Sequence, residues 1–270
     1  MNNKEPDMSR AISLIDSHIH LDDPRLMPGY PEHLNDARAL GITAWVLPST
    51  TAASFSDVLA IAAADTSVYP ALGLHPYFME THTDHDLKQL ETALKMHAGK
   101  LVAIGECGLD LMIENPQFER QERLFKAHVR LAREFDLPLI IHSRKSLDLI
   151  LRELRKERGL RGVIHAFSGS LQQAEQCIEL GFKLGFGGAV TYPRATRLRA
   201  ILKAIPKDSY LLETDAPSMP NAFLPKGAIH TPKDLYTIAQ EIATIRESSL
   251  EKVAAETTET TQQLFQLERL

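Results

Sequence analysis

Short apolar runs alternate with longer amphipathic segments from residue 12 onward. The apolar runs are rich in Val, Ile, Leu and Ala, which is typical of buried strands. We predict strands near 12–17, 43–48, 68–74, 101–106, 138–142, 162–166, 183–188 and 210–214. The amphipathic segments predict helices near 31–40, 53–65, 84–98, 117–136, 145–158, 170–180 and 195–204, and two more near 232–246 and 249–266.

Eight strands alternating with helices predict a parallel sheet that is covered on both faces. Each of four glycines falls between a predicted helix and the next strand, where a left-handed residue ends a helix: Gly41, Gly99, Gly159 and Gly181. The strands recur about every 28 residues without the interruption at which an open sheet reverses direction, which favours a (β/α)8 TIM barrel with an additional C-terminal helix. A doubly wound sheet is the competing fold, but the glycines at 185–188 lack the G-x-G-x-x-G spacing.

The bulk composition sets the domain organisation. The 270 residues are 44% hydrophobic and can bury a large core, and nothing in the sequence marks a second domain. We predict a flexible, polar N-terminal tail over 1–11, in which Met8 is a second possible start, and a single domain over 12–270. Secretion signals and apolar runs of ~18 residues are absent, so no membrane attachment is expected. Cys107 and Cys177 are too few for a disulfide framework, which favours a reducing cytoplasm.

Potential metal ligands recur at the strand ends. The first predicted strand runs into His18 and His20, which share one face because side chains alternate along a strand. A His-x-His pair is a weak signal by itself, because short motifs carry false positives. Further strands end on Glu106, His142, His165 and Asp215, and another on His75. In a TIM barrel all of these ends meet at the rim where active sites lie.

The six ligands on strands 1, 4, 5, 6 and 8 comprise four imidazoles and two carboxylates. One metal needs only three or four such groups, so six predict two divalent ions that share a carboxylate. Nitrogen and oxygen ligands together suit Zn²⁺ or Mn²⁺, whereas Mg²⁺ prefers oxygen and water, and the identity of the ions stays open. Such a pair can lower the pKa of a shared water beside a polarised substrate oxygen, which is hydrolysis chemistry.

Six segments carry a family resemblance: Asp16-Ser-His-Ile-His, Gly73-Leu-His-Pro, Ile104-Gly-Glu-Cys-Gly-Leu-Asp, Ile140-Ile-His-Ser-Arg, His165-Ala-Phe-Ser-Gly and Leu211-Leu-Glu-Thr-Asp-Ala-Pro. In order, from about residue 12 to 266, they resemble the signature blocks of the TatD family of metal-dependent hydrolases and deoxyribonucleases, a TIM-barrel branch of the metallo-dependent amidohydrolase superfamily. The resemblance implies that His18, His20 and Asp215 bind a first metal, that Glu106 bridges, and that His142 and His165 bind a second. It also implies a phosphodiester substrate, typically a DNA end.

The loop after the last predicted strand departs from the family pattern. It reads Lys226-Gly-Ala-Ile-His-Thr-Pro where the family often has Arg-Gly-Lys-Arg-Asn-x-Pro, so two basic residues are lost and His230 replaces Asn. Leu111 stands where Tyr or Phe is common, and Thr260 where Asn is usual. These changes leave the ligand set intact and put the substrate in doubt. A formal net charge of -5 also lacks the basic footprint of a tight duplex binder.

Three rim residues are candidates for contact with the substrate. His75 faces the substrate or supports a ligand in this interpretation, although it could simply pack. Arg144 could clamp a phosphate with two donors or form a surface ion pair at a helix start. Ser168 opens the sixth βα loop, where it could donate to an oxyanion or cap a helix. Cys107 has the opposite parity to Glu106 and is expected in the helix-facing core.

Catalytic roles fall to Asp215 and Glu106. Asp215 is expected to bind a metal or to accept a proton from the attacking water. Glu213 lies two residues earlier on the same face, so its loss is expected to affect stability before chemistry. Asp16 shares the face of His18 and is expected to orient a ligand imidazole.

The leading functional hypothesis is a divalent-metal-dependent deoxyribonuclease that cleaves phosphodiester bonds at DNA ends through a two-metal-activated water. The alternative is an amidohydrolase-type enzyme acting on a lactone, a cyclic amide or another C–N or ester bond. In that branch the bridging position on strand 4 is often a modified Lys, whereas this chain has Glu106. A regulatory metal protein without turnover is disfavoured, because open metal sites are typical of catalysis. Nothing in the sequence indicates an obligate protein partner.

Overall fold

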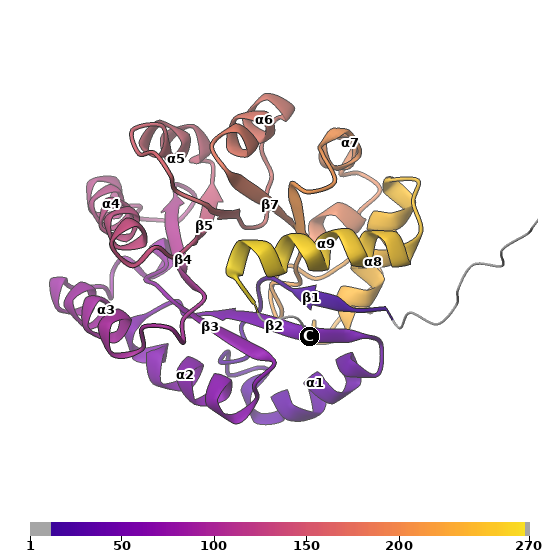
Figure 1. Cartoon of the computed structure of the whole chain (residues 1–270), viewed down its shortest axis with the longest axis horizontal. Coiled ribbons are helices and arrows are strands. Elements are labelled where there is room, and N and C mark those ends of the chain that lie inside the picture. The colour runs from indigo at the N-terminus through magenta and orange to yellow at the C-terminus, as the bar shows by residue number, and fades with distance from the viewer. Residues whose placement is uncertain (1–11, 268–270) are drawn as a thin grey trace, which may run out of the picture.

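Eight parallel strands form one sheet in which neighbours follow chain order. The computed structural model describes residues 12–267, so the predicted tail over 1–11 and residues 268–270 lie outside it. The strands are β1 (Leu14–Asp16), β2 (Ile42–Pro48), β3 (Val68–Leu72), β4 (Ala103–Asp110), β5 (Leu139–Arg144), β6 (Gly162–Ile164), β7 (Phe182–Phe186) and β8 (Tyr210–Leu212). Ser17 N–H donates to the Leu212 carbonyl, and Asp215 N–H to the His18 carbonyl, each at 2.9 Å. These bonds join β1 to β8, which confirms the predicted TIM barrel (Figure 1).

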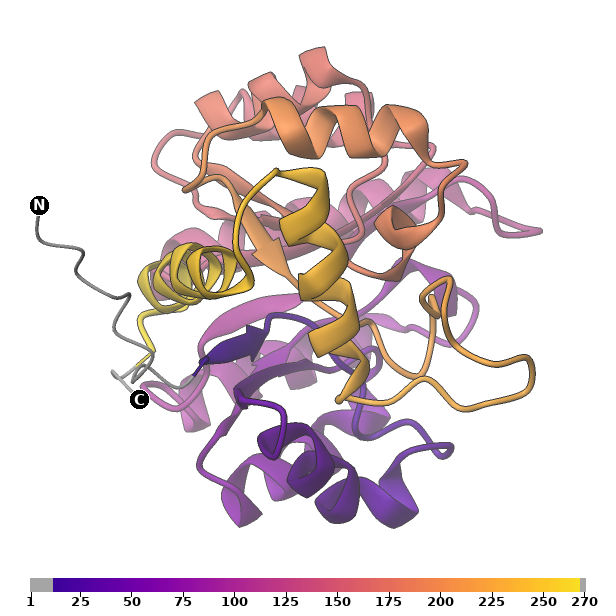
Figure 2. The same cartoon turned by 90° about the vertical axis from the view of Figure 1, so that its right-hand side faces the viewer.

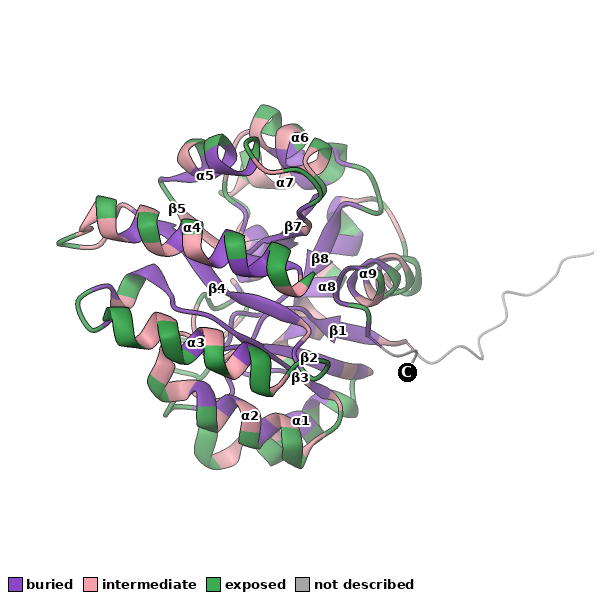
Figure 3. Cartoon of the chain, turned by 60° about the vertical axis from the view of Figure 1, so that its left-hand side comes forward, coloured by how far each residue is buried: buried purple, intermediate pink, exposed green. Residues whose placement is uncertain are grey.

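Helices surround the barrel, with buried inner faces and exposed outer faces (Figure 3). They are α1 (Tyr30–Arg38), α2 (Phe55–Ala64), α3 (Asp84–Met96), α4 (Phe118–Phe135), α5 (Leu147–Leu154), α6 (Leu171–Glu179), α7 (Thr196–Ala204) and α8 (Asp234–Ile245). Short 3-10 turns occupy loops at η1 (Met27–Gly29), η2 (Ala52–Ser54), η3 (Pro76–Phe78) and η4 (Gly188–Thr191). The four glycines predicted to end helices all have positive φ, between +78° and +87°.

The last helix, α9 (Leu250–Phe265), lies across one end of the barrel (Figures 1 and 2). Thr258 Oγ1 donates to the carbonyl of Ser13, at the start of β1, at 2.8 Å. The last turn of α9 and Leu267 pack against the inward-facing apolar residues of the strands, among them Ile15, Val46 and Leu211. A second, larger apolar cluster fills the space between the sheet and the outer helices. The N-terminal end of the barrel is therefore plugged, and the opposite rim is left for chemistry.

Strand β4 runs four residues further than predicted, to Asp110. Gly108 permits this, because a Cβ built there would lie 2.0 Å from the carbonyl oxygen of His142 on β5. Gly108 also has φ +138°, a conformation that side chains with a Cβ rarely adopt. The extension pairs Asp110 with Arg144 and brings a second carboxylate to the rim beside Glu106.

Within residues 12–267, every helix is too short or too polar to cross a lipid bilayer.

Candidate metal centre

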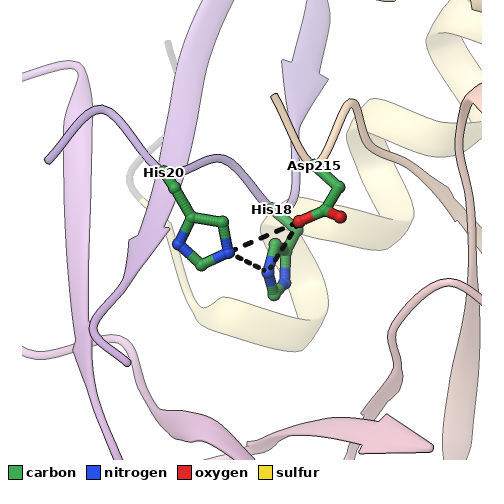
Figure 4. A group of neighbouring side chains, drawn as sticks. All are labelled: His18, His20 and Asp215. Carbon is green, nitrogen blue, oxygen red and sulfur yellow. Dashed lines mark hydrogen bonds and ion pairs between the residues drawn. The ribbon is translucent and has the colours of Figure 1, made fainter. Parts of the chain in front are cut away.

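The six predicted ligands meet at the C-terminal rim. His18 and His20 follow β1, and their Nε2 atoms lie 3.1 Å apart. Asp215 follows β8, and its Oδ1 lies 3.6 Å from His18 Nε2 and 3.4 Å from His20 Nε2. Figure 4 shows the two rings and this carboxylate turned toward one another. The two imidazoles therefore lie together as predicted, although they lie in the loop after β1 rather than in the strand itself.

Glu106 on β4 divides its two oxygens between two groups of imidazoles. Its Oε2 lies 3.2 Å from His18 Nε2 and 3.5 Å from His20 Nε2. Its Oε1 lies 3.2 Å from His142 Nδ1 and 3.9 Å from His165 Nε2. A carboxylate in this position can bridge two cations, as the resemblance implied.

His75 also reaches Glu106, with Nε2 3.0 Å from Oε1. The backbone N–H of Tyr77 donates to His75 Nδ1 at 2.9 Å, so Nδ1 is the unprotonated nitrogen. Burial lowers the pKa of His75 to about 4, which keeps the ring neutral with its proton on Nε2. His75 therefore points an N–H, rather than a lone pair, at Glu106 and holds that carboxylate in place.

Two further carboxylates orient the ligand imidazoles. Glu213 Oε1 lies 3.1 Å from His165 Nδ1 and also accepts from the Ala166 N–H at 2.7 Å. Asp110 Oδ2 lies 3.2 Å from His142 Nε2, which leaves Nδ1 facing Glu106. Carboxylates in such positions fix ring orientation and raise the basicity of the ligand. Glu213 thus contacts a predicted ligand, and the prediction that its loss affects stability before chemistry stays a prediction.

Asp110 was missed as a site residue, although the sequence contained a signal. It lies four residues after Glu106 on the same strand, so alternation places both side chains on one face. The predicted strand ended at residue 106, which hid this relationship.

Asp16 supports the site through the backbone rather than through an imidazole. Its Oδ1 accepts from the His18 N–H at 3.2 Å and from the Thr214 N–H at 2.9 Å, and Oδ2 accepts from Thr214 Oγ1 at 2.6 Å. The prediction that it orients a ligand ring is therefore wrong. Its three hydrogen bonds instead fasten the end of β1 to the chain after β8, between the residues that carry His18 and Asp215.

The buried imidazoles and carboxylates of the site shift the pKa values of one another. Burial opposes protonation of His165, but Glu213 and Asp215 outweigh it and raise the pKa of His165 to about 10. Burial likewise favours a neutral Asp215, but His165, His20 and His18 lower the pKa of Asp215 to about 2. The pKa of Glu106 also lies well below its ordinary range, since the neighbouring imidazoles overcome the effect of burial. Both carboxylates are ionised at neutral pH.

The donor set fits divalent metal ions. Three groups each bring ligand atoms within 4.8 Å of one another: His18, His20 and Asp215; His18, Glu106 and His165; and His75, Glu106 and His142. Buried carboxylates and imidazoles this close together are costly unless a cation or protons neutralise them. His75 does not suit the role of a metal ligand, because its Nε2 carries the proton and points that proton at Glu106. The remaining nitrogens and carboxylate oxygens suit Zn²⁺ or Mn²⁺ better than Mg²⁺.

Two of the predicted substrate residues are exposed at the rim, whereas a residue that departs from the family pattern in the β8–α8 loop is buried. Arg144 and Ser168 are both exposed at the rim and line one groove. His230, which replaces the usual Asn, is instead 2% exposed. Its Nε2 lies 3.1 Å from the Thr214 carbonyl and its Nδ1 lies 3.0 Å from Asp234 Oδ2. His230 therefore anchors the β8–α8 loop to the chain beside Asp215.

Cys107 is buried in the outer core, as predicted.

The barrel and its donor set define a metal-dependent hydrolase. Residues 15–266 match the family model described as TatD related DNase. The chain belongs to this family.

Relatives along the whole chain agree with this assignment. The uncharacterized metal-dependent hydrolase YjjV of Escherichia coli K12 is 41% identical over 253 residues, which is 93% of this chain and 97% of YjjV. The uncharacterized metal-dependent hydrolase YabD of Bacillus subtilis is 31% identical over 94% of this chain and 99% of its own length. The crystal structure of the E. coli TatD homologue YjjV superimposes with a TM-score of 0.92, covering 96% of this chain and 100% of that one.

Proposed function

We propose that this metal-dependent hydrolase is a deoxyribonuclease that cleaves phosphodiester bonds at DNA ends and uses two divalent ions. The observation that carries the proposal is the division of the Glu106 oxygens between two groups of imidazoles. Two cations bridged by one carboxylate suit in-line displacement at phosphorus, because both the attacking and the leaving oxygen need positive charge nearby. The family description as TatD related DNase supports the same chemistry.

Each protein group has a defined part in this proposal. When bound, the two ions supply an acidified water and polarise a phosphoryl oxygen. His18, His20 and Asp215 would hold one ion, His142 and His165 would hold the other, and Glu106 would be shared between them. Glu213 and Asp110 keep the rings of His165 and His142 turned toward the centre.

Asp215 is the proposed general base. It is ionised at neutral pH, and its side chain is 12% exposed, so it is open to a water arriving from the rim. His20 and His142 are exposed to a similar degree, at 14% and 17%, whereas His18 is fully buried. The cluster is therefore open to solvent at Asp215, His20 and His142, where a phosphate can approach. His75 holds Glu106, and Arg144 and Ser168 are proposed to contact the substrate.

The test is a comparison of substrate classes with the metal-loaded enzyme. We expect turnover of a single-stranded oligodeoxynucleotide and of bis(p-nitrophenyl) phosphate, and no turnover of a panel of lactones and cyclic amides. Hydrolysis confined to the lactone or amide panel would overturn the proposal in favour of an amidohydrolase. Metal binding without turnover of any of these substrates would overturn it in favour of a regulatory protein.

A further inference from the structure

A groove of about 760 Å³ lies at the loops that follow β5 and β6. Ser143 and Ile164, which line it, are the direct neighbours of the ligands His142 and His165. Arg144 lies two residues after His142 on the same strand and also lines the groove. The groove therefore lies beside the metal centre, and Arg144, two residues from His142, lies between the two.

Three cationic side chains line this groove: Arg144, Lys145 and Arg197. All three are exposed, and none forms an ion pair with a carboxylate among residues 12–267. Arg197 reaches only the carbonyl oxygen of Ser168, at 3.2 Å. The groove contains one carboxylate, that of Asp148, which accepts a hydrogen bond from Gln173. An excess of free cations in a chain of net charge -5 marks this groove as a site for an anion.

Lys145 occupies an uncommon backbone conformation. Its φ is +57°, in the left-handed region that favours Gly, Asn or Asp. A Gly at this position would relieve the backbone but would remove a cation from the groove. A strained residue with a charged side chain beside a catalytic centre motivates a binding role.

The opposite side of the rim is apolar. Tyr77 after β3, and Phe223 and Ile229 after β8, expose between 53% and 59% of their surfaces. The ring of Tyr77 lies 6.5 Å from that of His75, at the edge of the metal centre. Figure 2 shows the long β8–α8 loop, which carries Phe223 and Ile229, projecting from the barrel. The two sides of the rim thus differ chemically, with cations on one side and exposed aromatic and aliphatic side chains on the other.

We propose that the groove is an anion subsite in which Lys145 and Arg197, together with Arg144, bind a second phosphate of a single-stranded nucleic acid end. This inference rests on the proposed phosphodiesterase function. The scissile phosphate lies at the metal centre, the neighbouring phosphate lies in the groove, and unpaired bases stack against the apolar side of the rim. Base stacking on aromatic side chains is tolerant of sequence and needs bases that are free of a duplex. The positive charge lost from the β8–α8 loop is supplied here instead.

The experiment compares Lys145→Gly, Arg197→Ala and the double variant with wild type. Lys145→Gly is chosen because Gly suits the backbone at this position. Arg158→Ala is the matched control, since Arg158 is exposed, has no ion pair among the described residues, and follows α5 near the opposite end of the barrel. The readouts are kcat/KM for bis(p-nitrophenyl) phosphate, kcat/KM for a single-stranded hexadeoxynucleotide, and the Kd of the fluorescein-labelled hexamer for chelator-treated protein.

We expect the double variant to keep its kcat/KM for bis(p-nitrophenyl) phosphate within twofold, because that diester has no second phosphate. For the hexamer, kcat/KM and affinity should fall about tenfold or more, and the salt slope of binding should shrink by about 0.7 for each cation removed. Arg158→Ala should match wild type throughout. Unchanged binding and cleavage of the hexamer by the double variant, or no hexamer binding by wild type, would overturn the subsite.

The binding readout separates this inference from the proposed function. If wild type cleaved neither diester but bound the hexamer through Lys145 and Arg197, the subsite would stand and the phosphodiesterase proposal would fail. If wild type and the double variant cleaved both diesters equally, the phosphodiesterase proposal would stand and the subsite would fail.

Discussion

The Nδ1 atom of His165 lies 3.1 Å from Oε1 of Glu213, so a buried carboxylate that binds no substrate fixes one ligand of the metal centre. Gly185 makes this possible, because a Cβ built there would lie 2.1 Å from Oε2 of Glu213. The pair gives different roles to the two acids that follow β8. Asp215 faces the centre directly, and Glu213 acts through the ring of His165.

Glu213→Gln should weaken metal binding about 10–100-fold while the barrel stays folded, because the neutral amide no longer raises the basicity of His165. Metal titration monitored by a chromophoric competitor would measure the change, with circular dichroism as a check on folding. Glu241→Gln serves as control, since Glu241 lies on α8, pairs with Arg199 on α7 and, within residues 12–267, contacts none of the predicted ligands. Metal affinity equal to wild type would show that Glu213 is only a structural residue.

Asp215→Asn should lower kcat by about 10²–10⁴, because the amide retains an oxygen donor but cannot readily accept a proton. His18, His20 and Glu106 should still retain metal. Metal content and kcat measured side by side with wild type decide the matter. Near-normal metal together with a rate within threefold of wild type would rule Asp215 out as the base.

Chelation should abolish activity without unfolding the barrel. The apolar clusters inside and outside the sheet are packed independently of the rim, and paired imidazoles and carboxylates keep the metal-free site partly neutralised. Elemental analysis of the purified protein should find divalent metal, up to two ions per chain. Turnover that survives chelation, in protein that contains no metal, would contradict the two-metal proposal.

Metal binding should release protons and strengthen as the pH rises. The pKa of His165 is raised to about 10 in the metal-free site, so its ring is protonated at neutral pH and must lose that proton to bind a cation. Titration calorimetry in two buffers of different ionisation enthalpy would count the protons. Affinity that does not change between pH 6 and pH 8 would contradict this expectation.

The raised pKa of His165 also makes the stability of the metal-free protein depend on pH. Because the pKa of His165 is raised in the folded state, its contribution to the stability of the metal-free protein is complete below the ordinary value of 6.5. That contribution is lost as the pH rises through about 10. Unfolding of chelated protein by urea should therefore become easier across this window, and loaded protein should show less of the effect.

His230→Ala should destabilise the protein by about 2 kcal/mol, because it leaves the buried Thr214 carbonyl without its His230 donor and removes one of the groups that bind Asp234. The β8–α8 loop should loosen, and kcat should fall with it. Urea midpoints would measure the stability change. His85→Ala is the control, since His85 is exposed on α3, and equal midpoints for the two variants would contradict the anchoring role.

The sequence by itself determined the barrel and its ligands. Apolar strands buried on both faces predicted a parallel sheet, and the regular spacing of βα units favoured a closed barrel over an open sheet. Because side chains alternate along strands and the strand ends of a barrel meet at one rim, His18, His20, Glu106, His142, His165 and Asp215 could be named before any coordinates. Local rules of alternation and spacing were enough for these residues, since each lies in a strand or shortly after its C-terminal end.

Only the tertiary structure decided how these groups face one another. The tautomer of His75 depends on the backbone N–H of Tyr77, and the role of Glu213 depends on a distance to His165 across two strands. Asp110 entered the site because Gly108 allowed β4 to continue against β5. Contacts between strands depend on close approach of atoms that lie far apart in the chain. A single sequence gives residue types and their periodicity, but these distances are set only when the barrel closes.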